Sequence, residues 1–120
     1  MIKTHTAPDE IRVSNGGKIL HVTFPENKAY DFSSELLRVE SPSAEVQGHS
    51  AAEKRTIAGK IGVIITNVEP VGNYGVRIVF NDGHDTGIYT WEYFSDLGDN
   101  KNLVWGDYLE RLKQFNLSRE

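Results

Sequence analysis

The chain has no cysteine among its 120 residues. This absence excludes disulfides, thiolate catalysis and any zinc or iron–sulfur site built on cysteine ligands. A long hydrophobic run is also missing, because no apolar stretch is longer than three residues, as in Val63-Ile64-Ile65, which ends at Thr66. Since a helix needs about 20 mostly apolar residues to cross a bilayer, we predict no membrane partner.

Positive charge is not in excess either. Lysine and arginine contribute 13 residues against 17 aspartates and glutamates, so the net charge is -4. Binding to nucleic acid derives much of its affinity from neutralising phosphates, so we predict no nucleic-acid partner. The first six residues contain no apolar stretch of the kind that a signal peptide needs. The expected location is therefore the cytoplasm.

Several motifs of common enzymes are absent. The chain contains no Gly-x-Gly-x-x-Gly fingerprint, no phosphate-binding Gly-Lys-Ser/Thr loop and no Gly-x-Ser-x-Gly elbow. It also lacks the His-x-Asp pair from which non-haem iron oxygenases build their metal triad. The sequence thus offers no positive case for an enzyme and favours a non-catalytic role.

The length and composition that are present are typical of one soluble domain. Hydrophobic residues make up 38% of the chain and charged residues 25%, which matches an ordinary globular profile. We therefore predict a single domain over residues 1–120, in which residues 1–8 form a flexible lead-in.

Alternating apolar residues predict a β-hairpin near the N-terminus. Its strands are expected at residues 10–13 and 18–24, joined through Asn15-Gly16, a dipeptide that favours hairpin turns because both residues tolerate positive φ. A short strand and a brief helical turn capped by Ser33 or Ser34 follow. Residues 40–60 lose periodicity, which predicts a long surface loop.

The second half predicts further strands and two helices. Residues 61–68, apolar on both faces, predict a central strand, and residues 74–80 alternate like another strand. A short strand at 88–89 leads into a helical stretch over 91–97 that Thr90 would cap. Helical spacing then predicts a C-terminal helix with one apolar stripe, formed by Trp105, Tyr108, Leu109, Leu112 and Phe115.

These elements indicate the α+β class. We expect a small, mostly antiparallel sheet with an N-terminal β-hairpin, a long central loop, and a C-terminal helix whose apolar stripe packs on the sheet.

A segment after the predicted 74–80 strand holds the most informative polar cluster. Asp82, His84 and Asp85 lie within four positions and could converge on a cation, while an exposed imidazole could act as an acid or base near neutral pH. The alternative is that they only satisfy backbone groups of a turn. His49, in the long loop, is a second candidate that could approach the same metal or could simply be solvated.

Several motifs together resemble one domain family. They are Leu36-Leu37-Arg38, Ser41-Pro42-Ser43-Ala44-Glu45-Val46, Val71-Gly72-Asn73-Tyr74-Gly75-Val76 and Asp82-Gly83-His84-Asp85-Thr86-Gly87-Ile88-Tyr89-Thr90-Trp91. Their order resembles that of the γ-butyrobetaine hydroxylase-like N-terminal domain, also called domain of unknown function 971. The resemblance covers nearly the whole chain and implies a small α+β domain, which precedes an oxygenase domain in the carnitine-pathway hydroxylases.

The resemblance also implies a structural zinc held by three cysteines and one histidine. In this chain the cysteine positions correspond to Ser41, Ser43 and Val46, while His84 matches the histidine. Serine hydroxyls are poor zinc ligands near neutral pH, valine is no ligand, and one histidine cannot hold a zinc ion alone. We therefore expect no cofactor and no zinc, and interpret these four positions as vestigial. A replacement metal site around His84 would need new partners from among His49, Asp82, Asp85 and Glu45.

Two functions follow from these observations. The resemblance and the missing oxygenase motif favour a stand-alone accessory module that is non-catalytic and binds a partner protein, in iron–sulfur or oxygenase pathways. The alternative is a small metal-binding protein or enzyme that uses a His84-centred site. The sequence leaves both a monomer and a homodimer open, since exposed edge strands could pair between copies.

Overall fold

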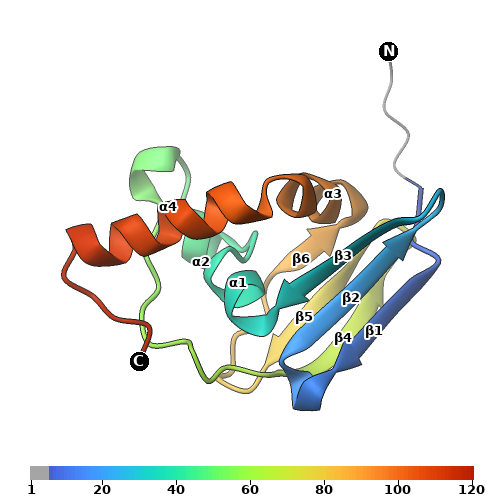
Figure 1. Ribbon diagram of the computed structural model, residues 1–120, viewed down its shortest axis with the longest axis horizontal. Coiled ribbons are helices and arrows are strands. Elements are labelled where there is room, and N and C mark those ends of the chain that lie inside the picture. Colours follow the sequence, from blue (N-terminus) through green and yellow to red (C-terminus); the bar gives the residue numbers. More distant parts are fainter. Residues whose placement is uncertain (1–5) are drawn as a thin grey trace.

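This computed structural model describes residues 6–120 of the chain. They contain two three-stranded antiparallel sheets and four α-helices (Figure 1). The first sheet, in the order β1-β2-β3, consists of β1 (Glu10–Ser14), β2 (Ile19–Phe24) and β3 (Lys28–Ser33). The second, in the order β4-β5-β6, consists of β4 (Ile65–Val71), β5 (Gly75–Phe80) and β6 (Ile88–Thr90). The helices are α1 (Ser34–Val39), α2 (Ala44–Gln47), α3 (Trp91–Asp99) and α4 (Lys101–Gln114).

The predicted α+β class is confirmed, with all strand pairs antiparallel in the described residues. The strands divide into two sheets where the sequence predicted one. Of the flexible lead-in predicted for residues 1–8, residues 1–5 lie outside the described part.

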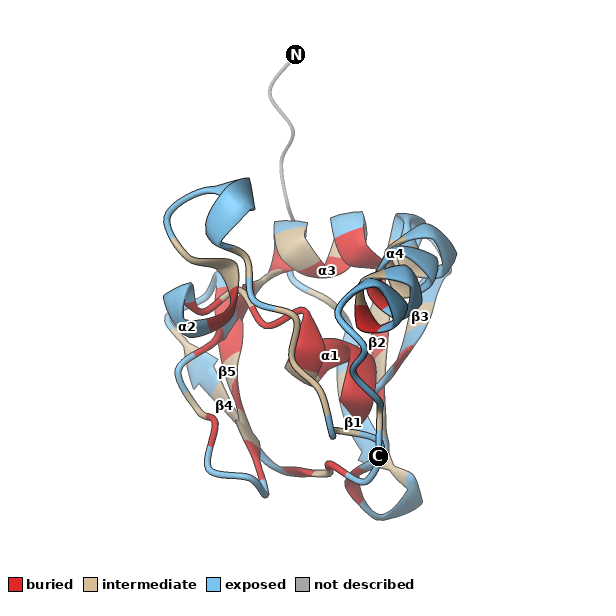
Figure 2. Ribbon diagram, turned by 90° about the vertical axis from the view of Figure 1, so that its left-hand side faces the viewer, coloured by how far each residue is buried: buried red, intermediate tan, exposed pale blue. Residues whose placement is uncertain are grey.

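The main hydrophobic core lies between the two sheets. Leu20 and Phe32 of the first sheet belong to one buried cluster with Ile78 and Phe80 of the second, and none of the four is more than 2% exposed. Figure 2 shows the sheets on opposite sides of the molecule. Helices α1 and α3 add the buried side chains Leu36, Leu37, Phe94 and Leu97. Removing this apolar surface from water is the main force that holds the layers together.

The N-terminal β-hairpin is confirmed, and its turn follows from local chemistry. Asn15, Gly16 and Gly17 all have positive φ, at 53°, 64° and 93°, a conformation that asparagine and glycine adopt at low cost. At Gly17 a Cβ atom would lie 2.4 Å from the carbonyl oxygen of Ile65. Glycine therefore also permits the turn to approach the start of β4.

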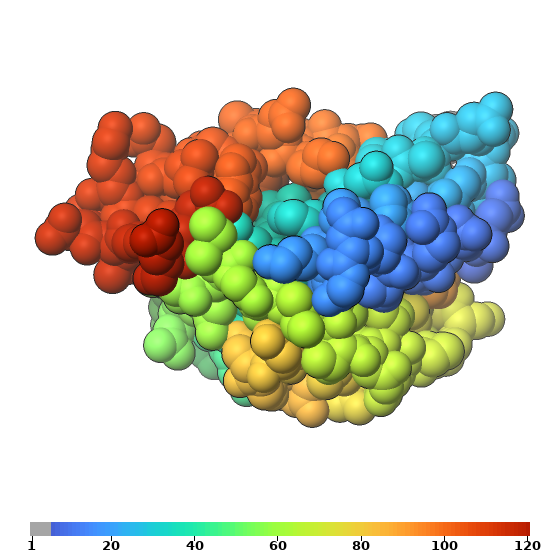
Figure 3. Space-filling model, turned by 60° about the horizontal axis from the view of Figure 1, so that its bottom comes forward, coloured from blue at the N-terminus to red at the C-terminus, as the bar shows by residue number. Residues whose placement is uncertain are grey.

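The prediction of a central strand over residues 61–68 is wrong in the bounds of the strand and in its place in the sheet. β4 begins only at Ile65 and is an edge strand, because β5 lies in the middle of the second sheet. The preceding residues pair with the C-terminal tail instead, where the Ile61 amide donates to the Arg119 carbonyl at 3.0 Å. Figure 3 shows the tail, in red, lying against this segment, in green. The apolar pattern arises partly because Val63, at 5% exposed, enters the core without being in a strand.

The loop predicted over residues 40–60 is partly regular. It contains α2 and a short 3-10 turn, Ala51–Glu53, and the remainder has no regular secondary structure. The Arg55 amide donates to the carbonyl of Val46 at 2.8 Å, which ties the end of the segment back to α2.

Side chains outside α1 form hydrogen bonds with the free backbone groups at both of its ends. The Ser33 hydroxyl caps the start by accepting from the Leu36 amide at 3.0 Å. At the other end, the hydroxyl of Tyr89 donates to the Leu37 carbonyl and that of Tyr93 to the Glu40 carbonyl. Carbonyls in the last turn of a helix lack partners within the helix, so these tyrosines allow a short helix to be buried.

Two buried carboxylates at α1 are paired with cations from distant segments. Glu35 accepts a bidentate contact from Arg119, at 2.8 and 2.7 Å. Glu40, directly after the helix, pairs with Lys54 at 2.6 Å and Arg111 at 3.1 Å. The side chains of Glu35 and Glu40 are 7% and 4% exposed. Carboxylates buried to this extent require such partners. Through Glu35 and Glu40, α1 and its C-cap therefore hold in place the C-terminal tail, α4 and the central segment, by which we mean residues 48–64 between α2 and β4.

The predicted C-terminal helix is present as α4, and most of its buried surface faces α1 and the central segment rather than a sheet. Tyr108 and Leu112 form a second core cluster with Val39, bordered by Ile57, Ala58 and Trp105. The predicted stripe is wrong for Leu109 and Phe115, which are 40% and 57% exposed. The reason is that only one narrow side of the helix is covered, and Phe115 lies beyond its last turn. Within residues 6–120, no helix is long and apolar enough to span a membrane.

Replacing Glu40 with alanine is expected to lower the free energy of unfolding by about 3 kcal/mol, because it leaves two cations without their buried carboxylate. Chemical denaturation measures this change. Glu110→Ala, at an exposed position on α4, is the control and should change stability by less than about 0.5 kcal/mol. Equal stability of the two variants would contradict the importance assigned to the Glu40 pairing.

Candidate functional site

His84 lies in the turn after β5 and is only 7% exposed. The turn is held on both sides of the residue. The amide of His84 donates to Asp82 Oδ1 at 3.0 Å, and its carbonyl accepts from the Phe80 amide at 3.0 Å. The backbone thus directs the imidazole into the molecule, toward the segment between α1 and α2.

Both ring nitrogens of His84 have partners. Nε2 lies 2.9 Å from the hydroxyl of Ser41, which is fully buried. Nδ1 lies 3.2 Å from Glu45 Oε2, in the first turn of α2. The three side chains therefore form a chain of contacts in the order serine, histidine, glutamate.

A second set of hydrogen bonds closes the same region. The hydroxyl of Ser43 lies 2.7 Å from that of Thr86 and also accepts from the Glu45 amide, which caps α2. The Ser43 amide in turn donates to the Ser41 hydroxyl at 3.2 Å. We call these five residues, Ser41, Ser43, Glu45, His84 and Thr86, the His84 corner. Side-chain contacts of His84 with Ser41 and Glu45, and of Thr86 with Ser43, link the turn after β5 to the start of α2.

Burial has the largest influence on the pKa of His84. It lowers the pKa of the imidazole, and the nearby Arg38 cation acts in the same direction, whereas Glu45 and Asp82 oppose them. The ring is therefore neutral at pH 7, with one donor and one acceptor nitrogen. When the proton is on Nδ1, it faces the Glu45 carboxylate, and Nε2 accepts a hydrogen bond from the Ser41 hydroxyl.

Asp82, a predicted ligand, is committed to other cations. Its carboxylate contacts Arg38 at 2.7 Å and Lys60 at 2.6 Å. Burial would raise the pKa of Asp82, but the hydrogen bonds from Lys60, the His84 amide and Arg38 outweigh it and hold the pKa below its ordinary range. This carboxylate therefore orients the turn and does not face the imidazole.

The other predicted partners of His84 lie elsewhere. His49 is exposed, and its amide donates to Glu53 at 2.8 Å. Asp85 pairs with Arg77 at 3.3 Å. Among the replacement partners predicted from the sequence, Glu45 is the one that contacts the ring. The contact with Ser41 has no local sequence signal, because the two residues are 43 positions apart.

The four positions that the family resemblance matches to zinc ligands offer a poor donor set. Serine hydroxyls bind zinc weakly near neutral pH, so His84 is the one ordinary zinc ligand among them, and its Nε2 atom lies 2.9 Å from the Ser41 hydroxyl. Val46 is buried but offers no ligand atom. Within the described residues, no group of three or more histidine, aspartate or glutamate side chains is arranged to hold a metal ion.

The order of Ser41, His84 and Glu45 matches that of a nucleophile, a base and an orienting acid. The surroundings oppose such chemistry, because Ser41 has no exposed surface and its oxygen already accepts from the Ser43 amide. Gly87 packs so closely that a Cβ atom there would lie 2.4 Å from the Ser41 oxygen. The Ser41 hydroxyl is thus shielded from solvent by its neighbours.

The free energy of unfolding is expected to fall as the pH decreases below about 6.5, because the unfolded chain binds a proton at His84 more readily than the folded chain. Above that pH both states hold a neutral ring and this contribution is constant. Urea unfolding between pH 7.5 and 5.5 should show a weaker pH dependence for His84→Gln than for the wild type. Identical slopes would contradict a buried, neutral His84.

Placing cysteine at positions 41, 43 and 46 is expected to create a tetrahedral zinc site with His84, since three thiolates and an imidazole form a standard structural set. Zinc bound per chain, measured after dialysis, should approach one for the triple variant. The same variant with His84→Ala should bind zinc more weakly. A folded triple variant that takes up no zinc would contradict the assignment of these positions.

Comparisons with known proteins agree with one family. The family model described as Gamma-butyrobetaine hydroxylase-like, N-terminal matches residues 11–95. Two solution NMR structures are each 39% identical to the chain. The match to the first covers 98% of this chain and 92% of the chain in that structure, with a TM-score of 0.84. The match to the second covers 100% of this chain and 91% of the chain in that structure, with a TM-score of 0.81.

A third similar structure is the crystal structure of a protein of unknown function from the DUF971 family of Acidithiobacillus ferrooxidans. It is 35% identical, covers 81% of this chain and 98% of its own, and has a TM-score of 0.65. No curated protein matches the chain. The chain therefore belongs to the gamma-butyrobetaine hydroxylase-like N-terminal family, also known as DUF971.

Proposed function

We propose that this domain is a non-catalytic accessory module that binds a partner protein in the cytoplasm. The observation that carries the proposal is the closure of the His84 corner. Its most reactive groups, the Ser41 hydroxyl and the His84 ring, are at most 7% exposed and bonded to each other. Because the Ser41 hydroxyl and the His84 imidazole contact each other inside the fold, they contribute to stability and are not free to bind or transform a substrate.

The surface of α4 supports a role in protein binding. Leu103 is 66% exposed, Leu109 40%, and Phe115, just beyond the helix, 57%. Covering any one of these side chains by a partner would remove apolar surface from water, which favours binding. The family resemblance directs the search for that partner to iron–sulfur and oxygenase pathways, with the domain acting as a monomer or homodimer.

The alternative function, a small enzyme or metal-binding protein centred on His84, draws support from the serine–histidine–glutamate order alone. It requires the 41–47 segment to open so that Ser41 becomes accessible. Opening the segment replaces the buried hydrogen bonds described above by hydrogen bonds to water, at a net cost of about 0.5–1.5 kcal/mol for each bond lost.

Replacing Ser41 with alanine separates the two functions. We expect the variant to lose about 1–2 kcal/mol of stability and to capture the same partner from a cell extract as the wild type. Neither protein should accelerate hydrolysis of the activated ester 4-nitrophenyl acetate. Turnover by the wild type that disappears in Ser41→Ala would contradict a non-catalytic role.

A further inference from the structure

A second set of serine, histidine and acid side chains lies on the first sheet, outside the His84 corner. Ser14 ends β1, His21 lies in β2 and Asp31 in β3, so three neighbouring strands each supply one side chain (Figure 1). Asp31 is directly opposite His21 in the strand register, and Ser14 is diagonal to it. Because residues in these positions share one face of a sheet, the three side chains meet on the face that is turned away from the buried Leu20 and Val22.

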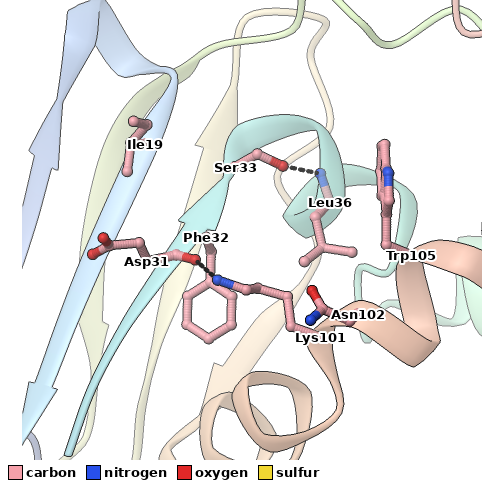
Figure 4. A pocket seen from close by; sticks show the side chains of 8 residues that line it. All are labelled: Ile19, Asp31, Phe32, Ser33, Leu36, Lys101, Asn102 and Trp105. Carbon is pink, nitrogen blue, oxygen red and sulfur yellow. Dashed lines mark hydrogen bonds between the residues drawn. The ribbon is translucent and has the colours of Figure 1, made fainter.

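The contacts among these three side chains match those of a nucleophile, a base and an orienting acid. Ser14 Oγ lies 2.7 Å from His21 Nε2, and His21 Nδ1 lies 2.6 Å from Asp31 Oδ1. The nearby Lys101 donates to the main-chain carbonyl of Asp31, at 2.8 Å (Figure 4). With a proton on Nδ1 facing the carboxylate, Nε2 accepts from the Ser14 hydroxyl, and this is the tautomer that a general base requires.

Solvent reaches this group of side chains, in contrast to the buried serine of the His84 corner. The side chain of His21 is 20% exposed and that of Asp31 67%, and Ser14 is half-buried. The turn that follows Ser14 is also open, because a Cβ atom on Gly16 would meet nothing within 4 Å apart from its chain neighbours. A small electrophile therefore has access to the Ser14 hydroxyl from the side of the turn.

We infer that Ser14 is a site of covalent modification, which takes an acyl group from a thioester. Ser14 Oγ forms a bond to the acyl carbon, and the bond from that carbon to sulfur breaks. The proton of the hydroxyl passes to His21 Nε2 and from there to the departing thiolate. A neutral acyl donor suits this site, because the Asp31 carboxylate beside the imidazole repels an anionic phosphoryl donor.

The transfer is expected to occur once per chain and not as turnover. A thiolate leaves the acyl carbon readily, whereas transfer of the acyl group from Ser14 to water must expel a serine alkoxide, which is a poorer leaving group. The ester on Ser14 therefore accumulates, as acyl intermediates do when their second step is slow. This modification goes beyond the accessory role and agrees with it, since a chain that is acylated once is not a catalyst.

The thioester S-phenyl thioacetate tests the inference on the full chain, at about pH 8, where an ordinary imidazole is neutral. Intact mass and peptide mapping should find one acetyl ester per chain, on Ser14, and Ser14→Ala should lack it. His21→Gln keeps the hydroxyl but removes the base, so it should acetylate Ser14 more slowly, on the order of 10²-fold. Ser50→Ala, at an exposed serine that makes no capping hydrogen bond, is the matched control and should react like the wild type.

Asp31→Asn tests the positioning role of the carboxylate. It should slow the acetylation of Ser14 and also change the tautomer of the His21 ring, which its ¹⁵N chemical shifts report. Unfolding by urea checks that each variant is folded. Acetylation of Ser14 at the rate of Ser50, or an unchanged rate in folded His21→Gln, overturns the inference. In that case the three side chains serve only as contacts between neighbouring strands.

Discussion

The fold depends on the ion pairs of two buried carboxylates, Glu35 in α1 and Glu40 directly after it. Glu35 and Glu40 are almost fully buried, and their cations come from the C-terminal tail, the central segment and α4. Removing one member of such a pair costs more than the pair itself contributes, because the remaining charge stays buried. A helix of only six residues thereby fixes segments that are distant from it in the sequence.

The same helix positions the His84 corner. Arg38 and Lys60 both contact the carboxylate of Asp82, and Asp82 accepts from the amide of His84, so α1 helps to fix the place of the corner. Within the corner, the Ser41 hydroxyl has no exposed surface and lies in contact with the imidazole. These contacts join the turn after β5 to the segment that follows α1.

Local signals made part of this structure predictable from the sequence. Asn15 and Gly16 determine a hairpin turn by their tolerance of positive φ, and Thr90 caps α3 through the Tyr93 amide as predicted. The division into two sheets and the packing of α4 on α1 depend on contacts between distant residues, which no local pattern encodes. The contact of Ser41 with His84 is of that second kind. The sequence singled out both positions through a family resemblance, and only the fold showed that they touch.

The central claim is that side-chain contacts among Ser41, His84 and Glu45 hold the corner together without a metal ion. The most direct test is the metal content of the tag-free wild-type protein by mass spectrometry, with its melting temperature measured before and after chelation. The account predicts far less than one zinc per chain and no change in melting temperature. One zinc per chain, whose removal lowers the melting temperature, would contradict it.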